Sequence, residues 1–403
     1  MFSASWTPLF IVLGVLSLLW KQRLLFMANV SVLAISLAAY SWGKISLKRV
    51  SYNKEIHPLR TFPGEPATLT ITLENHKLLP ITWLQMEEDV PEDLILKGGR
   101  LGIHYIPGRK RLLSFVSLGY YERVRRQYEI RFPRRGYYSL GPARLTCGDP
   151  FGFCKETLAL KDTTHLIVYP RILPLEALGL PARRPLGDTR VSDRLLQDPS
   201  FVAGIRDYDP SDSFKRIHWK ATARTGSLQV KVYEPRAETC TAVFLNAATY
   251  DPPWLGLDVD LLDQAITVAA SVFSLCLENR YVAGIFSNGC VAGTGTGLKI
   301  PPSRSPEMLE EGLAALAKMH GPSGSICTLL DSEVPGLPPG CGVVLVTGFT
   351  NEELRDSILA ARDTGRQVIV LLVGQNAHLD QCPGVTVRRV HLDGGAPLEL
   401  QIG

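Results

Sequence analysis

The sequence predicts a membrane helical hairpin, then an all-β, sandwich-like domain, then a doubly wound α/β domain. Three observations support this order: two uncharged apolar runs at the start, a two-residue hydrophobic period in the middle, and alternating strand and helix patterns at the end. We place the hairpin at 1–48, the β domain at 49–172, a linker with a charged motif at 173–238, and the α/β domain at 239–403.

The membrane hairpin is predicted from two runs without a charged side chain, 1–20 and Leu24 to Gly43. Each is close to the ~20 residues that a helix needs to cross the hydrocarbon layer. Aromatic side chains near the ends of the runs suit the headgroup zone: Trp6, Trp20, Tyr40 and Trp42. The basic start and small-residue cleavage site of a signal peptide are missing. We therefore expect a multi-pass protein of the inner (cytoplasmic) membrane, in contact with the lipid bilayer.

Charge and cysteine usage predict that the soluble part faces the cytoplasm. The connector between the two runs carries Lys21 and Arg23, whereas the segment after the second run carries Lys44, Lys48 and Arg49. The positive-inside rule assigns the more basic side to the cytoplasm. The eight cysteines are scattered without a CxxC pair, and we interpret them as buried free thiols in a reducing compartment.

The β domain is predicted from about residue 50 to residue 170. Residues 67–73 (ATLTITL) alternate strictly between apolar and polar side chains, as in a half-buried strand. Gly, Pro and Asn residues interrupt the segment at short intervals, which indicates short strands joined by turns. This pattern is typical of a β-sandwich. Within it, we interpret Glu87-Glu88-Asp89 as the solvated edge of a strand.

From Thr239 onward, short apolar strands alternate with amphipathic helices. Strands are expected at 241–245, 281–286, 342–346 and 367–373, and helices at 258–279, 305–319 and 351–363. Ser305-Pro306 suits the start of the second helix. Continuous apolar strands separated by helices predict a parallel sheet covered on both faces. In such sheets ligands bind at the carboxyl ends of the strands, so we expect any chemistry in the loop from Asn246 to Asp251.

Composition and motifs argue against nucleic-acid and nucleotide ligands. The 43 Lys and Arg residues are nearly matched by 39 Asp and Glu, and the formal net charge of +4 is spread along the chain. A phosphate-binding stripe would need clustered basic residues. The 246–251 loop contains neither GxGxxG nor GxxxxGK(S/T). We therefore expect no nucleic-acid partner and no cofactor.

The most informative stretch is GIRDYDPSDSFKRIHWKATAR, residues 204–224, which combines many charges of both signs with large aromatic side chains. Six of its residues form the candidate interaction motif: Arg206, Tyr208, Asp212, Trp219, Lys220 and Arg224. Three interpretations of the stretch remain open at this point, namely a structural joint, a docking surface and a catalytic centre.

In the structural interpretation, Arg206 and Arg224 pair with neighbouring aspartates while Trp219 fills a joint between two domains, because buried charge must be paired. In the docking interpretation, part of the cluster stays exposed, since Arg, Tyr and Trp anchor interfaces. In the catalytic interpretation, a hydrolase would use His218 as a base oriented by Asp209 or Asp212. No nucleophile with clear geometry accompanies His218, so we expect a protein that is not an enzyme and keep the hydrolase as an alternative.

These features together resemble one bacterial family. The amino-terminal hairpin, the motifs RGYYSLGP and DPFG in the β domain, and the 204–224 stretch ahead of an α/β domain are similar to the family named domain of unknown function 58. The resemblance implies a membrane-anchored protein with a von Willebrand factor A-like domain. It also implies partnership with a MoxR-type AAA+ ATPase. We therefore expect a scaffold or adaptor that acts in protein assembly or maturation at the membrane.

The resemblance also raises the question of a metal. Von Willebrand A-like domains often bind Mg²⁺ through Asp-x-Ser-x-Ser after the first strand and a further Asp on a later strand. This sequence has Asn246, Ala248 and Tyr250 in the first motif, and Thr347 where the later Asp is expected. Because Mg²⁺ depends on charged oxygen ligands, we expect a degenerate site without metal. Metal-dependent ligand adhesion is kept as a second alternative.

Overall fold

The structure of the protein is a computed structural model that describes residues 12–14, 16, 19–20, 22–150, 154–174, 178, 197–209, 212, 214, 217–235, 240–251, 255–305, 307–374 and 382–390. For 197–203 and 232–235 the backbone alone is described. The chain divides into two units, Met1–Arg171 with Gly395–Gly403, and Ile172–Gly394, and each unit is considered by itself. Most of the predicted first membrane span and most of the predicted linker up to residue 196 lie outside the described residues.

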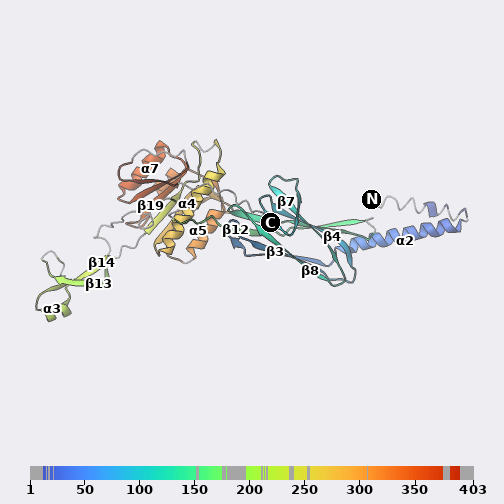
Figure 1. Cartoon of the computed structure of the whole chain (residues 1–403), viewed down its shortest axis with the longest axis horizontal. Coiled ribbons are helices and arrows are strands. Elements are labelled where there is room, and N and C mark those ends of the chain that lie inside the picture. The colour runs from blue at the N-terminus through green and yellow to red at the C-terminus, as the bar shows by residue number, and fades with distance from the viewer. Residues whose placement is uncertain are drawn as a thin grey trace. The chain divides into compact units, whose positions relative to one another are not determined.

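The first unit begins with an apolar helix, α2 (Arg23–Ser46), which confirms the predicted apolar amino-terminal helix (Figure 1). Its 24 residues give a length of about 36 Å, enough to cross a hydrocarbon layer of ~30 Å. Of its side chains, only Ala39, Gly43 and Ser46 are buried. Among the described residues one other helix has the length and composition of a membrane span, but that helix, Val259–Glu278, is mostly buried in the second unit.

Strands dominate the described residues of the first unit after this helix, which confirms a β-rich region there. They are β1 (Val50–His57), β2 (Arg60–Thr61), β3 (Ala67–Asn75), β4 (Ile81–Pro91), β5 (Ile95–Lys97), β6 (Arg100–Ile103), β7 (Arg109–Leu118), β8 (Arg123–Arg131), β9 (Gly136–Leu140), β10 (Ala143–Gly148), β11 (Lys155–Leu160) and β12 (Thr164–Val168). The sheets have the orders β1-β3-β8-β5, β11-β10-β4-β7-β6 and β2-β12-β9.

The two larger sheets share one hydrophobic core. Leu69, Ile71 and Leu73 of β3 are at most 1% exposed, and they belong to the same buried cluster as Leu84 and Met86 of β4. Residues two apart on a strand point to the same face. The alternation in 67–73 therefore sends one set of side chains into the core, where each buried leucine or isoleucine contributes about 2 kcal/mol.

An ion pair lies inside this β-rich unit. Lys54 Nζ is 2.6 Å from Glu88 Oε1, and both side chains are 0% exposed. Lys54 also donates to the carbonyl of Leu140 at 2.8 Å, and the Tyr52 hydroxyl donates to Glu88 Oε2 at 2.5 Å. Burial raises the pKa of the Glu88 carboxyl, and Lys54 opposes that rise. The interpretation of Glu88 as part of a solvated strand edge is therefore wrong, because Lys54 and Tyr52 supply its partners from the facing sheet.

From Cys240 onward, the described part of the second unit contains one sheet and four helices, which include most of the predicted elements. Their bounds are β15 (Cys240–Leu245), α4 (Val259–Glu278), β16 (Val282–Val291), β17 (Gly297–Ser303), α5 (Met308–Ala317), β18 (Met319–Pro322), α6 (Ile326–Glu333), β19 (Gly342–Thr347), α7 (Glu352–Asp363), β20 (Val368–Val373) and β21 (Thr386–Val390). The strand order is β17-β16-β15-β19-β20-β21, with β18 on β16. Five strands pair in parallel, whereas β17 and β18 are antiparallel to β16.

Helices cover both faces of this sheet. Ala242 and Phe244 of β15 belong to a core cluster with α6 and α7. The alternating residues Val243 and Leu245 are also 0% exposed and point to the other face, where α4 contacts the central strands. The predicted start of α5 at Ser305-Pro306 is wrong: the N-cap is Glu307, which makes no side-chain capping bond.

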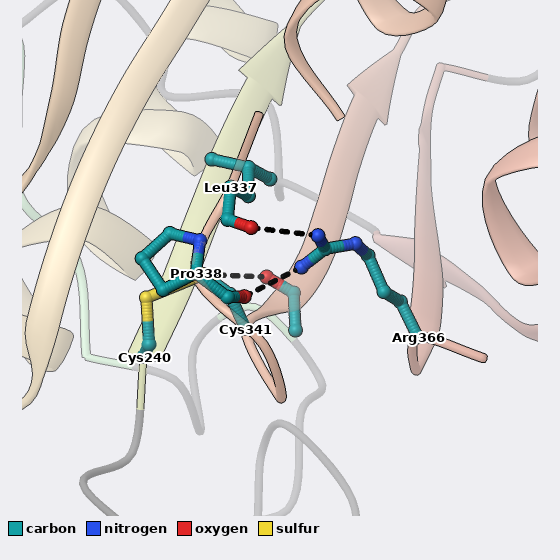
Figure 2. The surroundings of a disulfide bond; sticks show 6 residues. Cys240, Leu337, Pro338, Cys341 and Arg366 are labelled. Atoms are coloured by element: carbon teal, nitrogen blue, oxygen red, sulfur yellow. Dashed lines mark hydrogen bonds between the residues drawn. A yellow bond between two sulfur atoms is a disulfide. The ribbon is translucent and has the colours of Figure 1, made fainter. Parts of the chain in front are cut away.

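A disulfide joins Cys240, at the start of β15, to Cys341, directly before β19 (Figure 2). The two Cα atoms are 4.5 Å apart. Because Thr241 pairs with Gly342 on parallel neighbouring strands, the residues that precede them lie side by side. The interpretation of all eight cysteines as free thiols is therefore wrong for this pair. The sequence hides the pair because 101 residues separate its members.

The remaining six cysteines are free, in agreement with the prediction for them. Burial raises the pKa of the Cys147 thiol to about 11 and that of Cys276 to about 12, so both stay protonated at neutral pH. Close to the disulfide, Arg366 donates to the carbonyls of Leu337 and Pro338, both at 2.7 Å (Figure 2). This arginine holds the chain segment that leads into Cys341.

Replacing Lys54 by Met should destabilise the β-rich unit, because Glu88 would lose its cation inside the core. Breaking one side of a buried ion pair costs about 3–5 kcal/mol. Hydrogen exchange of the intact protein, followed by mass spectrometry, should show faster exchange in β1, β3 and β4. The matched control is Lys97→Met, since Lys97 is exposed on β5 of the same unit. Equal exchange in the two variants would show that the pair contributes little.

Candidate functional site

The 204–224 stretch folds as a two-stranded ribbon closed by a short helix (Figure 1). Strand β13 (Gln197–Asp207) pairs antiparallel with β14 (Gln229–Pro235), and helix α3 (Trp219–Thr225) lies between them in sequence. We call the described residues from 204 to 231 the signature hairpin. Its small interior consists of Ile217 and Val230, which are 4% and 1% exposed.

The acidic residues of the signature hairpin hold its first turn. Arg206 donates to Asp212 Oδ1 at 2.6 Å; the arginine side chain is 49% exposed and the aspartate 7%. Asp212 Oδ2 also accepts from the backbone N–H of Asp209 at 3.1 Å. The Asp212 carboxylate raises the pKa of Arg206 and keeps it charged. Arg206 and Asp212 are therefore used to shape the chain between the ribbon and the helix.

A second set of polar contacts fixes the other end of the hairpin. Gln229, which is 8% exposed, donates to Asp207 Oδ1 at 2.5 Å and to Ser227 Oγ at 3.1 Å. Its backbone N–H donates to Thr222 Oγ1 at 3.0 Å. Gly226 ends α3 with a φ of +74°, a left-handed conformation that suits glycine. Gln229, which lies on β14, thus contacts β13 through its side chain and α3 through its backbone N–H.

His218 is the N-cap of α3. Its ring Nδ1 accepts from the backbone N–H of Ala221 at 3.0 Å, and the backbone N–H of His218 donates to the carbonyl of Gln229 at 2.8 Å. Among the described residues no carboxylate lies within ion-pair distance of His218, so neither Asp209 nor Asp212 orients it there. A base in a His–Asp pair would need such a partner. In the described part of the chain, His218 instead satisfies a free N–H at a helix start.

The signature hairpin exposes large aromatic and basic side chains, along with the acidic residues Asp207 and Asp209. Trp219 is 68% exposed and Phe214 71%, and the ring centroids of Phe214 and Tyr208 lie 5.7 Å apart. Lys220 and Arg224 are also exposed on α3, which has no buried residue. Exposed large aromatics beside cations are the residue types that anchor interfaces. We call these five aromatic and basic residues the hairpin surface.

The second candidate site lies at the carboxyl ends of the central parallel strands. Asn246 directly follows β15, and Thr347 is the last residue of β19. Asn288 lies on β16, one residue beyond the last residue of that strand that pairs with β15. The three side chains are 1%, 5% and 0% exposed. Since β16, β15 and β19 are neighbours, topology brings these residues together. We call them the strand-end network.

Hydrogen bonds between neutral groups satisfy this network. Asn246 Nδ2 donates to Thr347 Oγ1 at 3.2 Å, and Asn246 Oδ1 accepts from Asn288 Nδ2 at 3.2 Å. Asn288 Nδ2 also donates to the Gly324 carbonyl at 2.9 Å, while its Oδ1 accepts from the Ala247 N–H at 2.7 Å. Each amide holds the backbone of a neighbouring loop.

The strand-end network does not fit a divalent cation. Its donor set contains no carboxylate, and its amide oxygens are already engaged by N–H groups. Ala248 offers no side-chain ligand, and Tyr250 is 44% exposed. Nowhere in the described part of the chain do three or more His, Cys, Asp or Glu residues gather as metal ligands. Dehydrating Mg²⁺ at this position would be left without charge compensation.

Sequence analysis identified two members of the network and missed the third. Asn246 and Thr347 were named because they stand where von Willebrand A-like domains carry metal ligands. Asn288 was missed because it lies inside a long strand, where an amide signals nothing by itself. The available signal was the break in the apolar run of 282–286 at Ser287-Asn288-Gly289, where the pairing of β16 with β15 ends.

Replacing Asn288 by Ala should destabilise the second unit, because the Ala247 N–H and the Gly324 carbonyl would lose their partners. A buried unsatisfied group costs about 1–3 kcal/mol, and thermal unfolding should show the loss. The control Asn279→Ala removes an exposed amide from the same unit.

Millimolar Mg²⁺ should leave the melting midpoint of the wild type unchanged, since only a ligand of the native state raises it. A rise with Mg²⁺ would contradict the absence of a cation site.

Comparisons with known proteins found one similar curated protein and several distant solved structures. The chain is 22% identical over 352 residues to the uncharacterised protein YeaD of Bacillus subtilis strain 168, covering 83% of this chain and 82% of that protein. Among solved structures, the major pilin subunit BcpA of Bacillus cereus aligns at 8% identity over 30% of this chain and 41% of its own, with a TM-score of 0.23. A cohesin module of Clostridium perfringens aligns at 13% identity over 30% of this chain and 96% of its own, also at 0.23.

TM-scores this low carry no argument about fold or function. The family comparison is more informative, because it starts within the signature hairpin and runs through most of the described α/β sheet. Residues 204–379 match the family described as "Protein of unknown function DUF58". This is the family that the 204–224 motif predicted, and residues 204–379 of the chain are similar to it.

Proposed function

We propose that this protein is a membrane-anchored, non-catalytic adaptor that binds a partner protein through the hairpin surface. The observation that carries the proposal is that some motif residues bond to each other within the signature hairpin, whereas others are exposed to solvent. Arg206, Asp212 and His218 are engaged inside the hairpin, whereas Trp219 is 68% exposed with Lys220 beside it. A tryptophan kept in water on a rigid support favours the docking interpretation over the structural one.

The chemistry of the surface defines the partner. Residues 204–231 contain six Lys or Arg residues against three Asp. A complementary partner would offer an apolar pocket for Trp219 and Phe214, with acidic side chains at the rim for Lys220 and Arg224. The family resemblance suggests a MoxR-type AAA+ ATPase as that partner. An adaptor of this kind would contribute binding alone, and the ATPase would supply the energy for assembly or maturation.

The α/β sheet supports the same proposal. We infer a von Willebrand factor A-like domain from its parallel sheet with helices on both faces, in which neutral amides have replaced the metal ligands. An adhesion site without its cation would bind through its shape and surface instead. The hydrolase alternative is weaker because His218 caps a helix and lacks a carboxylate partner among the described residues.

Helix α2 would anchor the adaptor in the inner membrane, with the soluble part in the cytoplasm. Its length and the exposure of its apolar side chains support a membrane span. A cytoplasmic location follows from the charge pattern and from the need of an ATPase partner for ATP. The Cys240–Cys341 disulfide argues for the opposite side, since disulfides persist mainly in oxidising compartments.

The docking surface can be tested by crosslinking in native membranes followed by purification of the full-length protein. Trp219→Ala should lose the partner, because an interface tryptophan contributes about 2 kcal/mol or more, equivalent to a roughly thirtyfold rise in Kd. The matched control is Phe115→Ala, an aromatic side chain 64% exposed on β7. Both variants must unfold at the wild-type temperature.

Three results of this experiment have different meanings. Loss with Trp219→Ala alone supports docking by the hairpin surface. Unchanged recovery in the folded Trp219→Ala protein contradicts it. Recovery of a protein that is not an AAA+ ATPase would leave the surface in place and overturn the proposed partner class.

Membrane orientation needs a reporter that reagents can reach. Cys147 is 0% exposed and cannot serve. Ser117 is exposed on β7, and Ser117→Cys changes a single atom. If the soluble part faces the cytoplasm, a membrane-impermeant maleimide should label this variant above the wild-type background only after cells are permeabilised. Labelling in intact cells would place the soluble part outside and exclude a cytoplasmic ATPase as the partner.

A further inference from the structure

The end of helix α2 is bound to the β-rich unit by one buried lysine. Lys77, in the loop between β3 and β4, donates from Nζ to the carbonyl of Ser46 at 2.6 Å and to that of Lys48 at 2.9 Å. Burial lowers the pKa of this lysine. The last carbonyls of a helix lack intrahelical partners and carry partial negative charge, so a cation is favourable there. Lys77 therefore fixes where the helix ends relative to the strands.

Two turns of the β-rich unit meet at this helix end. The N–H of His76 donates to the carbonyl of Arg49 at 3.0 Å, and the N–H of Tyr121 donates to the carbonyl of Lys77 at 3.3 Å. Asn75 Nδ2 also donates to the carbonyl of Gly119 at 2.7 Å, so the β3–β4 loop and the β7–β8 turn are bonded together. Tyr121 lies two hydrogen bonds from the last turn of α2.

These turns expose large apolar and aromatic side chains beside cations. Leu78 is 75% exposed, Tyr120 72% and Tyr121 65%. Lys48 and Arg49 follow the helix and are exposed as well. We call these five residues the juxtamembrane collar. Tyr121 has a φ of +50°, an uncommon backbone conformation for a residue other than glycine. Three such side chains together on one tip require an explanation beyond the packing of the β-rich unit.

The helix itself shows the same residue types at the same level. Tyr40 is 43% exposed near the end of α2, and Lys44 Nζ lies 4.6 Å from the centre of its ring. Tyrosine rings favour the boundary between headgroups and hydrocarbon, where basic side chains meet lipid phosphates. Two separate parts of the chain therefore place tyrosines and cations around one helix end.

We propose that the juxtamembrane collar inserts into the headgroup layer of an anionic phospholipid bilayer. This rests on the proposed membrane span of α2. A helix of about 36 Å that crosses ~30 Å of hydrocarbon leaves its last turn among the headgroups, and Lys77 holds the collar to that turn. Leu78 and the two tyrosines contact the upper acyl chains, while Lys48 and Arg49 bind lipid phosphates. The collar thus sets the tilt of the β-rich unit on the membrane.

Depth-dependent fluorescence quenching in nanodiscs tests this contact with the full-length protein. Three variants, each with one added cysteine, carry a small fluorophore: Tyr120→Cys in the collar, Phe115→Cys on β7, and Leu37→Cys on α2. Phe115 lies about 17 Å from Tyr120 along an extended chain. The quencher for positions 115 and 120 is a phospholipid with a nitroxide near its headgroup, and the quencher for position 37 carries the nitroxide midway along an acyl chain, each in phosphatidylcholine with or without phosphatidylglycerol. Wild-type protein treated in the same way gives the background.

The proposal expects several-fold stronger quenching at position 120 than at 115, with 37 also quenched. Quenching at 37 without quenching at 120 would overturn the collar and leave the membrane span intact. Equal quenching at 120 and 115 would also overturn it, because the whole β-rich unit would then lie on the lipid. An unquenched label at 37 would overturn the membrane span and the collar together.

A charge-reversal variant tests the role of Lys48 and Arg49 separately. Lys48→Glu with Arg49→Glu should reduce quenching at position 120 in discs that contain phosphatidylglycerol and leave quenching at 37 unchanged. Because neither residue is part of the apolar tip, the effect should be small in pure phosphatidylcholine. Equal quenching before and after the charge reversal in the anionic discs would contradict the assignment of lipid phosphates to Lys48 and Arg49.

Discussion

The fold depends on a few buried polar side chains that find their partners inside the protein. Lys54 and Glu88 face each other inside the β-rich unit, and Lys77 binds the last carbonyls of α2. Asn246 and Asn288 connect the loops at the ends of the parallel strands. An unpartnered buried group would cost several kcal/mol against a net stability of about 5–15 kcal/mol. These side chains are therefore committed to the structure and are not available for chemistry.

The same constraint separates structural from functional residues in the signature hairpin. Its charged residues look catalytic in sequence, but Arg206 and Asp212 pair with each other and His218 caps a helix. Trp219 is different, because its burial would be favourable and the fold leaves it in water. An exposed tryptophan costs stability that binding can recover, whereas an exposed lysine costs nothing. Trp219 is therefore the most informative residue of the motif for function.

The hydrophobic periodicity of the sequence predicted the strands and helices well. It could not predict which residues contact each other across neighbouring strands and sheets. The alternation of 67–73 and the apolar runs near 243 and 370 follow directly from local burial. The partners of Glu88 lie on another sheet, and Cys240 and Cys341 lie 101 residues apart, so no local pattern contains them. Exposure of Trp219 is likewise a property of the assembled hairpin. Local chemistry thus predicts where a residue lies along an element, and only the topology decides what it meets.

The strand register also bears on the conflict between the disulfide and a cytoplasmic location. The pairs from Thr241–Gly342 to Leu245–Val346 hold β15 and β19 together by backbone hydrogen bonds and buried side chains. Cys240 and Cys341 would therefore remain neighbours in the reduced protein, because the ladder rather than the sulfur bond sets their distance. Proximity makes the bond possible, and the redox poise of the compartment decides whether it persists. The sheet itself is compatible with either side of the membrane.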